Sequence, residues 1–417
     1  MKRLRQASIP LVALVLVGLP VFWAFPEDLP AGRSAGIVLG WIGCGLLLTN
    51  LLLMLREVRL AKLLGGLERM YAWHHVLGTV AYLSLLAHPL AFAIDAGNGS
   101  WRLAWATLSP WQQHWPVWLG WAALLCLMLG LAATFSHRTS YPVWRWLHAL
   151  LPVAVFLGFA HLILLGLSQT LLLSLSLAVL FSLWRILRVD FGLAAKPFLV
   201  EEVESVADKV VELTLRPLAT PLDVQPGQFA LFAFQGGEGF HGCREYHPFT
   251  ISAIGPTGKL RIAIKALGDC TSHLQSVTPG TSVRVHGPFG DFLGNRDGTP
   301  QLWVAGGIGI TPFLAVLRSE RLTESTCLLY FYRQPHDAAY VEELRTLEKQ
   351  QAHLALRVHA GQPDGFELAD SLPDAAALAK MGCYLCGPPG LISGAIDILE
   401  RRGVSRNAIH FEHFDFR

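Results

Sequence analysis

Six long apolar stretches dominate the first 190 residues of the chain, near residues 8–25, 35–55, 70–94, 116–135, 143–165 and 168–188. Each can cross about 30 Å of hydrocarbon as a helix, which takes about 20 residues. From about Lys196 the pattern changes to short runs of β-favouring residues bounded by Pro and Gly, such as FLVEEVESVA, KVVELTLRPL and GQFALFAF. The pattern predicts a six-helix α-helical transmembrane bundle followed by an antiparallel β-barrel.

A third pattern follows the barrel, in which strands alternate with helices. The run QLWVAGGIGITPFLAVL predicts a strand, a glycine turn and a helix, and later strands are predicted at CLLYFYRQ and CYLCGPPG. Such alternation indicates an α/β Rossmann-like domain. We therefore expect a multi-domain chain with a transmembrane domain, a barrel domain and an α/β domain, at residues 1–192, 193–297 and 298–417.

Composition and charge distribution place the first domain in a membrane. The 417 residues are 52% hydrophobic and only 15% charged, whereas the net charge of +2 gives no indication of nucleic-acid binding. The predicted connections carry two cationic residues on one side, Arg33 and Arg102. The other side carries eleven, namely Lys2, Arg3, Arg5, Arg56, Arg59, Lys62, Arg69, Arg138, Arg145, Arg185 and Arg188.

The positive-inside rule then predicts a multi-pass protein of the cell inner (plasma) membrane with both termini cytosolic. The alternative is that the first segment is a cleaved signal peptide, since KRLR precedes an apolar run. That run is longer than the apolar core of most signal peptides, and its removal would spoil the charge pattern.

Four histidines lie inside two of the apolar stretches, where a polar ring is costly and therefore indicates function. His74 and His88 are 14 residues apart. On an ideal helix they lie about 40° from alignment and about 21 Å apart, which places them on one face at two depths. His75 would point about 140° away from His88, and this favours His74 over His75.

His148 and His161 are 13 residues apart, which leaves them about 140° out of line on a straight helix. Pro152 lies between them and can kink the helix. Because both helices run outward, we expect His74 level with His148 and His88 level with His161. We interpret the pairs as axial ligands of two b-type hemes, which leave no iron position for substrate. The alternatives are packing histidines, or proton relays in a non-enzymatic transporter.

Two segments of the barrel and one of the α/β domain carry candidate binding chemistry. HPFTIS at residues 247–252 ends a strand, and IKALGDCTS at residues 264–272 places a glycine and two hydroxyls at a predicted helix N-terminus, suited to a pyrophosphate. A turn and an N-cap are the alternative there. In GGIGITP, Gly306, Gly307 and Gly309 let a backbone approach a dinucleotide closely, and the helix dipole favours its phosphates.

The seven cysteines fit neither a disulfide framework nor a zinc site. Cys383 and Cys386 form a CxxC, but no second pair accompanies them.

These motifs, in this order after a six-helix membrane half, resemble the ferric reductase and NADPH oxidase superfamily of transmembrane flavocytochromes. The resemblance covers nearly the whole chain, through the histidine-bearing helices and the motifs HPFTIS, GPFG, GGIGITP, CGPPG and EHFDFR. It implies a transmembrane oxidoreductase that passes electrons from cytosolic NAD(P)H through FAD and two b-type hemes to an acceptor on the outer side.

The resemblance also implies roles for single residues. Those expected to hold the flavin and its pyrophosphate are His247, Pro248, Phe249, Thr250, Lys265, Gly268, Thr271 and Ser272. Those expected to receive NADPH are Gly306, Gly307, Gly309, Thr311, Pro312, Gly387 and Pro388. Cys386 is expected near the nicotinamide, and Arg333 near the adenosine 2′-phosphate, since a guanidinium binds phosphate bidentately. If Arg333 is only an exposed strand-end residue, NADH is the alternative.

Three further residues bear on the chemistry. Phe414 is expected to stack on the flavin, with Phe416 as a second candidate and C-terminal packing as the alternative. Arg33 resembles an arginine near the outer heme of oxygen-reducing members, although an interfacial anchor is an equal interpretation. Phe92 stands where those members carry a histidine, which argues against superoxide production.

The outer acceptor is expected to be O2, giving superoxide, rather than ferric iron. The predicted outer side carries no cluster of carboxylates, only Glu27, Asp28 and Asp95. A periplasmic protein partner is the third option, as with the heme membrane subunits that supply methionine sulfoxide reductases.

Overall fold

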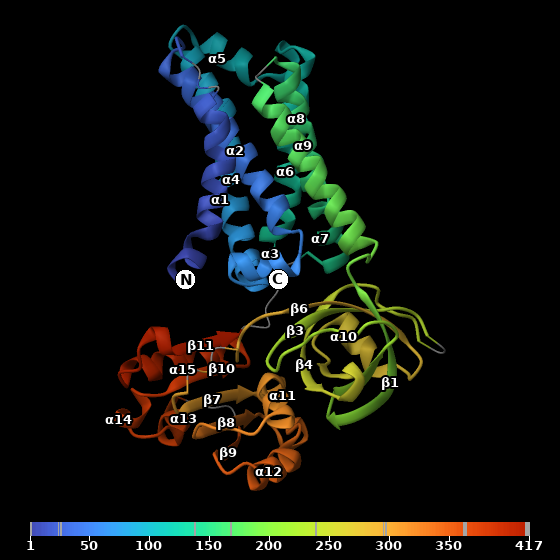
Figure 1. Cartoon of the computed structure of the whole chain (residues 1–417). Coiled ribbons are helices and arrows are strands. Elements are labelled where there is room, and N and C mark those ends of the chain that lie inside the picture. The colour runs from blue at the N-terminus through green and yellow to red at the C-terminus, as the bar shows by residue number, and fades with distance from the viewer. Residues whose placement is uncertain are drawn as a thin grey trace. The chain divides into compact units, whose positions relative to one another are not determined.

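The computed structural model describes residues 2–412 except 24, 26, 137, 138, 167, 168, 238, 239, 295, 297 and 362–364. The chain divides into two compact units, Met1–Leu193 and Ala194–Arg417 (Figure 1). The first is helical, and the second combines a β-barrel with a parallel sheet. This organisation confirms the predicted fold class.

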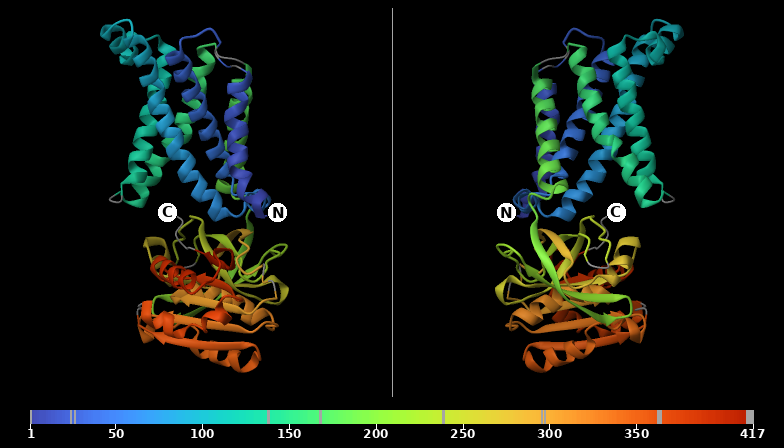
Figure 2. Two further views of the ribbon diagram at one scale, coloured as in Figure 1. Left: turned by 90° about the vertical axis from the view of Figure 1, so that its left-hand side faces the viewer. Right: turned by 90° about the vertical axis from the view of Figure 1, so that its right-hand side faces the viewer.

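Long apolar helices run side by side in the first unit (Figure 2). They are α1 (Lys2–Trp23), α2 (Ala31–Leu53), α4 (Leu67–Gly97), α6 (Trp115–Phe135), α8 (Leu150–Leu164) and α9 (Gln169–Arg185), with the shorter α3 (Val58–Leu64), α5 (Trp101–Leu108) and α7 (Tyr141–His148) between them. Among the described residues, five stretches are long and apolar enough to span a membrane, and Ala7–Trp23 is a shorter apolar helix. Helices α3 and α5 lie in regions that the sequence pattern predicts only as connections.

The fifth apolar stretch is broken into α7 and α8 at Ala149. Pro152 explains the position of the break, because it has no N–H to donate to the carbonyl four residues earlier, and its ring crowds that carbonyl. The carbonyl in question belongs to His148, the last residue of α7. The helix is therefore interrupted near Pro152, where a kink was predicted, and the interruption lies beside His148.

Glycines on α2 let α4 approach closely. A Cβ atom at Gly36 would come within 2.7 Å of the Phe92 ring, and one at Gly40 within 2.8 Å of His88 Nδ1. Two glycines four residues apart share one helix face, as in the small-residue contacts of membrane helices. The absence of side chains on this face of α2 therefore determines how near the histidine-bearing helix can lie.

The barrel of the second unit has six antiparallel strands in the closed order β1-β2-β5-β4-β3-β6. The strands are β1 (Lys196–Ala207), β2 (Val210–Pro217), β3 (Phe229–Phe234), β4 (His247–Ile254), β5 (Leu260–Lys265) and β6 (Ser282–Phe289). One short helix, α10 (Asp269–His273), follows β5. Apolar side chains such as Phe198, Phe232 and Ile262 fill the barrel core.

The rest of the second unit is a five-stranded parallel sheet in the order β11-β10-β7-β8-β9. Its strands are β7 (Gln301–Gly306), β8 (Thr326–Tyr332), β9 (Leu354–Ala360), β10 (Gly382–Cys386) and β11 (Ile409–Glu412). The accompanying helices are α11 (Thr311–Ser319), α12 (Val341–Gln350), α13 (Gly365–Ser371), α14 (Ala375–Leu378) and α15 (Pro389–Arg401). Strand order reverses between β7 and β10, and ligands bind at such a switch point in open α/β sheets.

A buried ionic network joins the barrel to the parallel sheet. Glu212 on β2 is 4% exposed and accepts hydrogen bonds from Arg318 Nη1 at 2.8 Å, Tyr340 Oη at 2.9 Å and Ser252 Oγ at 2.9 Å. Arg318, on α11, also binds both carboxylate oxygens of Glu343 through Nε at 2.7 Å and Nη2 at 2.8 Å. Within the barrel, Glu212 also has Arg261 Nη1 of β5 at 3.6 Å, so the docked sheet adds the closer cation and the Tyr340 hydroxyl.

Replacing Arg318 by leucine should strongly destabilise the second unit, by about 3–5 kcal/mol, because it removes the cation that contacts buried Glu212 at 2.8 Å and leaves only Arg261 at 3.6 Å. Thermal unfolding of the purified protein measures the effect. The control Arg345→Leu removes an exposed pair with Glu342 and should cost at most about 0.5 kcal/mol. Equal unfolding temperatures for both variants would contradict the role assigned to the network.

Candidate functional site

Two histidine pairs lie inside the helical unit. The ring centroids of His74 on α4 and His148 on α7 are 6.3 Å apart, and His88 and His161 lie within electrostatic range of each other. His75 is exposed and meets His74 only edge-on, with ring centroids 5.9 Å apart. Each pair therefore draws one ring from α4 and one from the broken α7–α8 segment, as expected from the sequence.

The rings of the second pair are each held by a backbone carbonyl. His88 Nδ1 donates to the Gly36 carbonyl at 2.7 Å, and His161 Nδ1 donates to the Pro116 carbonyl at 2.8 Å. Because a carbonyl can only accept, the hydrogen of each neutral ring is on Nδ1, and Nε2 keeps its lone pair. A fixed Nδ1–H with an available Nε2 is the usual arrangement of a metal-ligating histidine.

The same local arrangement, a backbone carbonyl with a glycine four residues later, holds both of these rings. In each case a glycine follows the accepting residue by four positions, namely Gly40 after Gly36 and Gly120 after Pro116. A Cβ at Gly120 would lie 3.2 Å from three ring atoms of His161, as one at Gly40 would crowd His88. In a helix, residue i+4 lies directly over the carbonyl of residue i, so glycine there opens the ring's approach to that carbonyl. Sequence reasoning missed these acceptors, although the glycine spacing is visible in the chain.

The rings of the first pair are held differently. Thr134 Oγ1 lies 3.3 Å from His148 Nδ1 and donates its own hydrogen to the Gly130 carbonyl at 3.0 Å. It can therefore only accept from His148, which again leaves Nε2 available. Trp144 stacks on the His148 ring at 4.8 Å, and the His74 ring bonds to the backbone carbonyl of Asn50.

The pairs lie at two levels of the bundle. Along α2, Gly36 is in the N-terminal half beside His88, and Asn50 is in the C-terminal half beside His74. Along α6, Pro116 beside His161 and Thr134 beside His148 are likewise at opposite ends. Within the described part of the chain, no three His, Cys, Asp or Glu side chains gather as a metal site. Among the described residues, each level therefore offers two imidazole nitrogens without a third His, Cys, Asp or Glu ligand beside them.

Arg33 and Phe92 lie near the His88 level. Arg33 is exposed in the first turn of α2, one turn before Gly36. The ring of Phe92 packs edge-on against His88, with centroids 4.9 Å apart and an interplanar angle of 72°. Phe92, at the position where oxygen-reducing relatives are expected to carry a histidine, is thus an apolar ring that packs against His88.

The HPFT segment begins β4 and presents unsatisfied polar atoms. His247 Nε2 and Thr250 Oγ1 are buried and have no hydrogen-bond partner among the described residues. Such atoms are costly unless a ligand pairs with them. Burial lowers the pKa of His247, and the charge of Glu245 only partly opposes this. The imidazole is therefore neutral near pH 7 and can either donate or accept.

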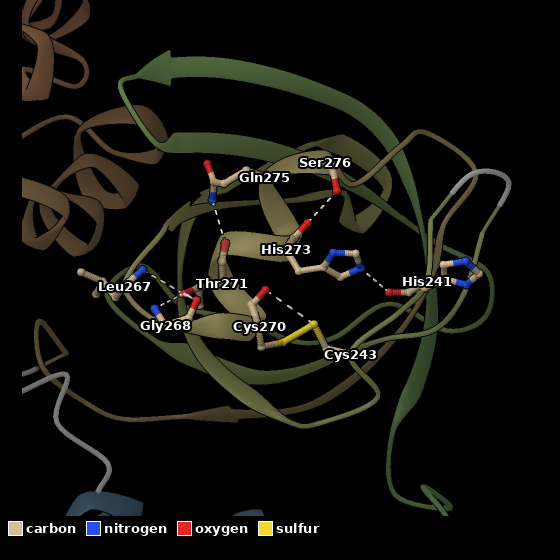
Figure 3. The surroundings of a disulfide bond; sticks show 9 residues. All are labelled: His241, Cys243, Leu267, Gly268, Cys270, Thr271, His273, Gln275 and Ser276. Atoms are coloured by element: carbon tan, nitrogen blue, oxygen red, sulfur yellow. Dashed lines mark hydrogen bonds between the residues drawn. A yellow bond between two sulfur atoms is a disulfide. The ribbon is translucent and has the colours of Figure 1, made fainter. Parts of the chain in front are cut away.

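The turn before α10 is organised by one hydroxyl (Figure 3). Thr271 Oγ1 accepts from the backbone N–H groups of Leu267 at 2.9 Å and Gly268 at 3.0 Å. Ser272 is exposed, and the described residues leave open space beside Gly268. Lys265 Nζ lies 3.5 Å from Asp337 Oδ1. Thr271 thus shapes the turn, whereas Gly268 and Ser272 face outward.

The three glycines of GGIGITP have different surroundings. A Cβ at Gly306 would meet Leu391 and Pro388, and one at Gly309 would collide with the Cys386 carbonyl. These two let the CGPPG turn pack against β7. Gly307 has φ +53° and open space among the described residues, so it is the position that a phosphate can approach. Two glycines that the sequence assigned to a dinucleotide thus serve packing between β7 and β10.

The start of α11 lies beside this turn, and its first hydroxyl bonds within the same segment. Thr311 Oγ1 donates to the Ile308 carbonyl at 3.0 Å, and Pro312 follows in the first helical turn. Gly387 has φ +159° at the end of β10, and Pro388 caps α15. These residues gather at the carboxyl ends of β7 and β10, which is the switch point of the sheet.

The CxxC residues lie on opposite faces of the sheet. Cys383 packs in one core cluster and Cys386 in the other, because residues three apart on a strand point to opposite sides. They cannot act as a pair. Burial raises the pKa of Cys383 to about 12, so its thiol stays protonated, and Cys386 is fully buried. Arg333 is exposed just after β8. Phe414 and Phe416 lie outside the described residues.

The cysteines were expected to fit no disulfide framework, and this expectation missed one disulfide that the structure contains. Cys243 and Cys270 form a disulfide, with Cα atoms 5.9 Å apart (Figure 3). They are 27 residues apart in the chain, and the bond joins the loop between β3 and β4 to α10. The spacing along the chain carries no signal of this, because the pairing depends on how the barrel closes.

Three family models match successive parts of the chain. "Ferric reductase like transmembrane component" matches residues 39–159, "FAD-binding domain" residues 195–296, and "Oxidoreductase NAD-binding domain" residues 303–397. The matched regions contain both histidine pairs except His161, the whole barrel, and the sheet from β7 to β10.

Similar proteins match about half of the chain. The ferredoxin–NAD(P)+ reductase component of the naphthalene 1,2-dioxygenase system of Pseudomonas putida is 26% identical over 229 residues, which is 52% of this chain and 67% of that protein. The reductase component of propane 2-monooxygenase of Rhodococcus jostii (strain RHA1) is 25% identical, over 52% of this chain and 62% of its own.

Among solved structures, the FAD/NAD-binding domain of nitric oxide dioxygenase from Vibrio cholerae matches with a TM-score of 0.46 and 25% identity, over 52% of this chain and 98% of that one.

The three family models match, in chain order, the histidine-bearing apolar helices, the closed barrel and the parallel sheet with its glycine turn. The protein is a membrane-associated NAD(P)H/FAD oxidoreductase of the ferric reductase family.

Proposed function

We propose that the protein is a transmembrane NAD(P)H oxidase or ferric reductase-type flavocytochrome b. It would take electrons from cytosolic NAD(P)H and deliver them to an acceptor on the outer face of the inner (plasma) membrane. FAD and two b-type hemes would be its resident cofactors, and both termini would be cytosolic. When bound, these groups supply the hydride and single-electron chemistry, while the protein binds and orients them.

The observation that carries this proposal is the arrangement of the four intramembrane histidines. At two levels of the bundle, two rings from different helices lie near each other. Three of the four have Nδ1–H held by an acceptor with Nε2 available. Two neutral imidazoles from separate helices are the ligands of a six-coordinate b-type heme. His74 rather than His75 is the proposed fourth ligand, because His75 is exposed.

The barrel residues fit a flavin. His247 Nε2 and Thr250 Oγ1 are buried on one strand without partners, and a flavin ring offers both donors and acceptors. The exposed turn at Gly268 and Ser272, with Lys265 at the end of the preceding strand, suits the negatively charged pyrophosphate. Phe414 or Phe416 is the proposed aromatic cover of the flavin. This chain's residues would therefore orient the isoalloxazine and neutralise the phosphates.

The sheet residues fit a nicotinamide dinucleotide. Gly307 is open at the switch point, and α11 directs its N-terminus there with Thr311 and Pro312 in the first turn. Cys386, Gly387 and Pro388 form the neighbouring turn and would place the nicotinamide. The exposed guanidinium of Arg333 favours NADPH, and NADH is the alternative. The network of Glu212 and Arg318 would keep this sheet docked on the barrel during transfer.

The proposed acceptor is O2, giving superoxide. Arg33 is exposed one turn from the carbonyl that holds His88, where a cation can stabilise a developing anion. Ferric iron and a periplasmic protein are the alternative acceptors. Phe92 beside His88 argues for one of these, because it replaces a polar group by an apolar ring.

Substitution of single histidines should remove one heme at a time. His88→Ala or His161→Ala should lower bound heme to about half, and so should His74→Ala or His148→Ala, because each removes one axial ligand of one level. The absorption spectrum and heme content of the purified protein measure this. His75→Ala is the matched control and should retain both hemes. A wild-type spectrum without low-spin b-type bands would refute the proposal and favour a transporter.

Superoxide production driven by NADPH should depend on Arg33. Arg33→Ala should lower the rate about tenfold, since a hydrogen bond to a charged group contributes about 1.5–3 kcal/mol. Arg102→Ala removes an exposed arginine on the same predicted side and should not change the rate. The assay is run in detergent with and without a ferric chelate. Fast iron reduction with no oxygen consumption would exclude the oxidase and support the reductase.

Acidification should weaken the second unit through His247. Its pKa is lowered by burial, so the unfolded chain takes up a proton near pH 6.5 that the folded chain resists. Stability linked to this residue is present above about pH 6.5 and is lost as the pH falls below it. Unfolding temperature measured from pH 5 to 8 should therefore fall less steeply in His247→Asn than in the wild type. His353→Asn, at an exposed position, should keep the wild-type slope.

A further inference from the structure

The Cys243–Cys270 disulfide links the two barrel segments assigned above to the flavin. Cys243 lies in the β3–β4 loop, four residues before His247 at the start of β4. Cys270 is the second residue of α10, two residues after Gly268. The disulfide therefore links the loop that precedes the HPFT strand to the turn proposed to bind the pyrophosphate.

Non-covalent contacts reinforce the same junction (Figure 3). His273 Nε2 donates to the backbone carbonyl of His241, two residues before Cys243. The His273 ring also stacks on Phe240, with centroids 4.8 Å apart and an interplanar angle of 15°. Phe240 is 2% exposed and belongs to the barrel core. The loop thus has contacts that survive without the disulfide, and only its covalent restraint is chemically reversible.

Cys243 and Cys270 are half-buried and pack against the edge of the barrel core, so neither is enclosed in the fully buried interior. The Cys243 sulfur lies 3.6 Å from the Cys270 carbonyl oxygen, which gives a Cys243 thiol an acceptor after reduction. Disulfides that form in a reducing cytosol are usually transient or redox-sensing. With the cytosolic placement proposed above for this unit, the bond has the surroundings of a reversible couple and not of a permanent cross-link.

We propose that Cys243 and Cys270 form a redox-controlled latch on FAD retention, an inference that rests on the proposed function. In the disulfide form the loop and α10 hold the HPFT strand and the Gly268 turn in the flavin-binding arrangement. A thiolate of a dithiol reductant attacks one sulfur and breaks the S–S bond, forming a mixed disulfide. The reductant's second thiol resolves it. Two electrons and two protons pass to Cys243 and Cys270, and the reductant leaves as a disulfide.

Reduction then removes a covalent restraint but not the fold. The loop remains attached through His241 and Phe240, so its residues sample more arrangements while β4 stays paired with β3. A ligand that bridges the two segments must then order the loop on binding, which lowers its affinity. FAD retention should therefore be graded by redox state, with faster release in the dithiol form.

The test uses the full chain, purified in detergent with FAD bound. Fluorescence of released FAD gives its dissociation rate before and after treatment with dithiothreitol, and maleimide labelling with mass analysis counts the thiols. We expect reduction to expose two additional thiols, at Cys243 and Cys270, and to speed FAD release about tenfold. Reoxidation should restore slow release, which shows that the protein stayed folded.

Variants separate the latch from other effects of the reductant. Cys243→Ser/Cys270→Ser should release FAD at the reduced rate under both conditions, whereas Cys327→Ser, at a free half-buried cysteine, should respond like the wild type. The inference is overturned if FAD release is independent of redox state, if the double variant still responds, or if both thiols are free without reductant. A chain that binds no FAD in either state refutes the proposed function as well.

Discussion

The structure depends on how polar imidazoles are satisfied inside apolar helices. A histidine ring in hydrocarbon needs a partner for its N–H, and water is not available to provide it. His88 and His161 use backbone carbonyls of Gly36 and Pro116, and His148 uses the hydroxyl of Thr134. These bonds determine which nitrogen carries hydrogen, and they leave the other nitrogens available at two levels of the bundle.

That requirement also governs helix packing. A carbonyl inside a helix already accepts its own i+4 hydrogen bond, so a second donor reaches it only where the overlying residue has no side chain. Gly40 and Gly120 provide this opening on α2 and α6. The histidine-bearing helices can then lie against helices rich in small residues. The close approach and the ring orientation are consequences of the same glycines.

In the second unit, the arrangement of the segments depends on residues that connect them to one another. Glu212 and Arg318 join barrel to sheet, and Cys243 and Cys270 join the β3–β4 loop to α10. On β4, His247 and Thr250 have buried polar atoms with no partner among the described residues. The surrounding structure thus supports an arrangement that costs free energy until a ligand binds.

The sequence alone determined the helical spans, the change to a barrel and a parallel sheet, and the four histidines, because hydrophobic periodicity and the cost of polar groups in lipid are local properties. Tertiary structure decided which atoms satisfy those histidines, that Gly306 and Gly309 serve packing while Gly307 stays open, and that two cysteines pair. It also located the break between α7 and α8 at Ala149, three residues before the Pro152 that the sequence had indicated. These features depend on contacts between segments far apart in the chain. The spacing of Gly36 and Gly40 is visible in the sequence, but spacing alone does not say which segments meet.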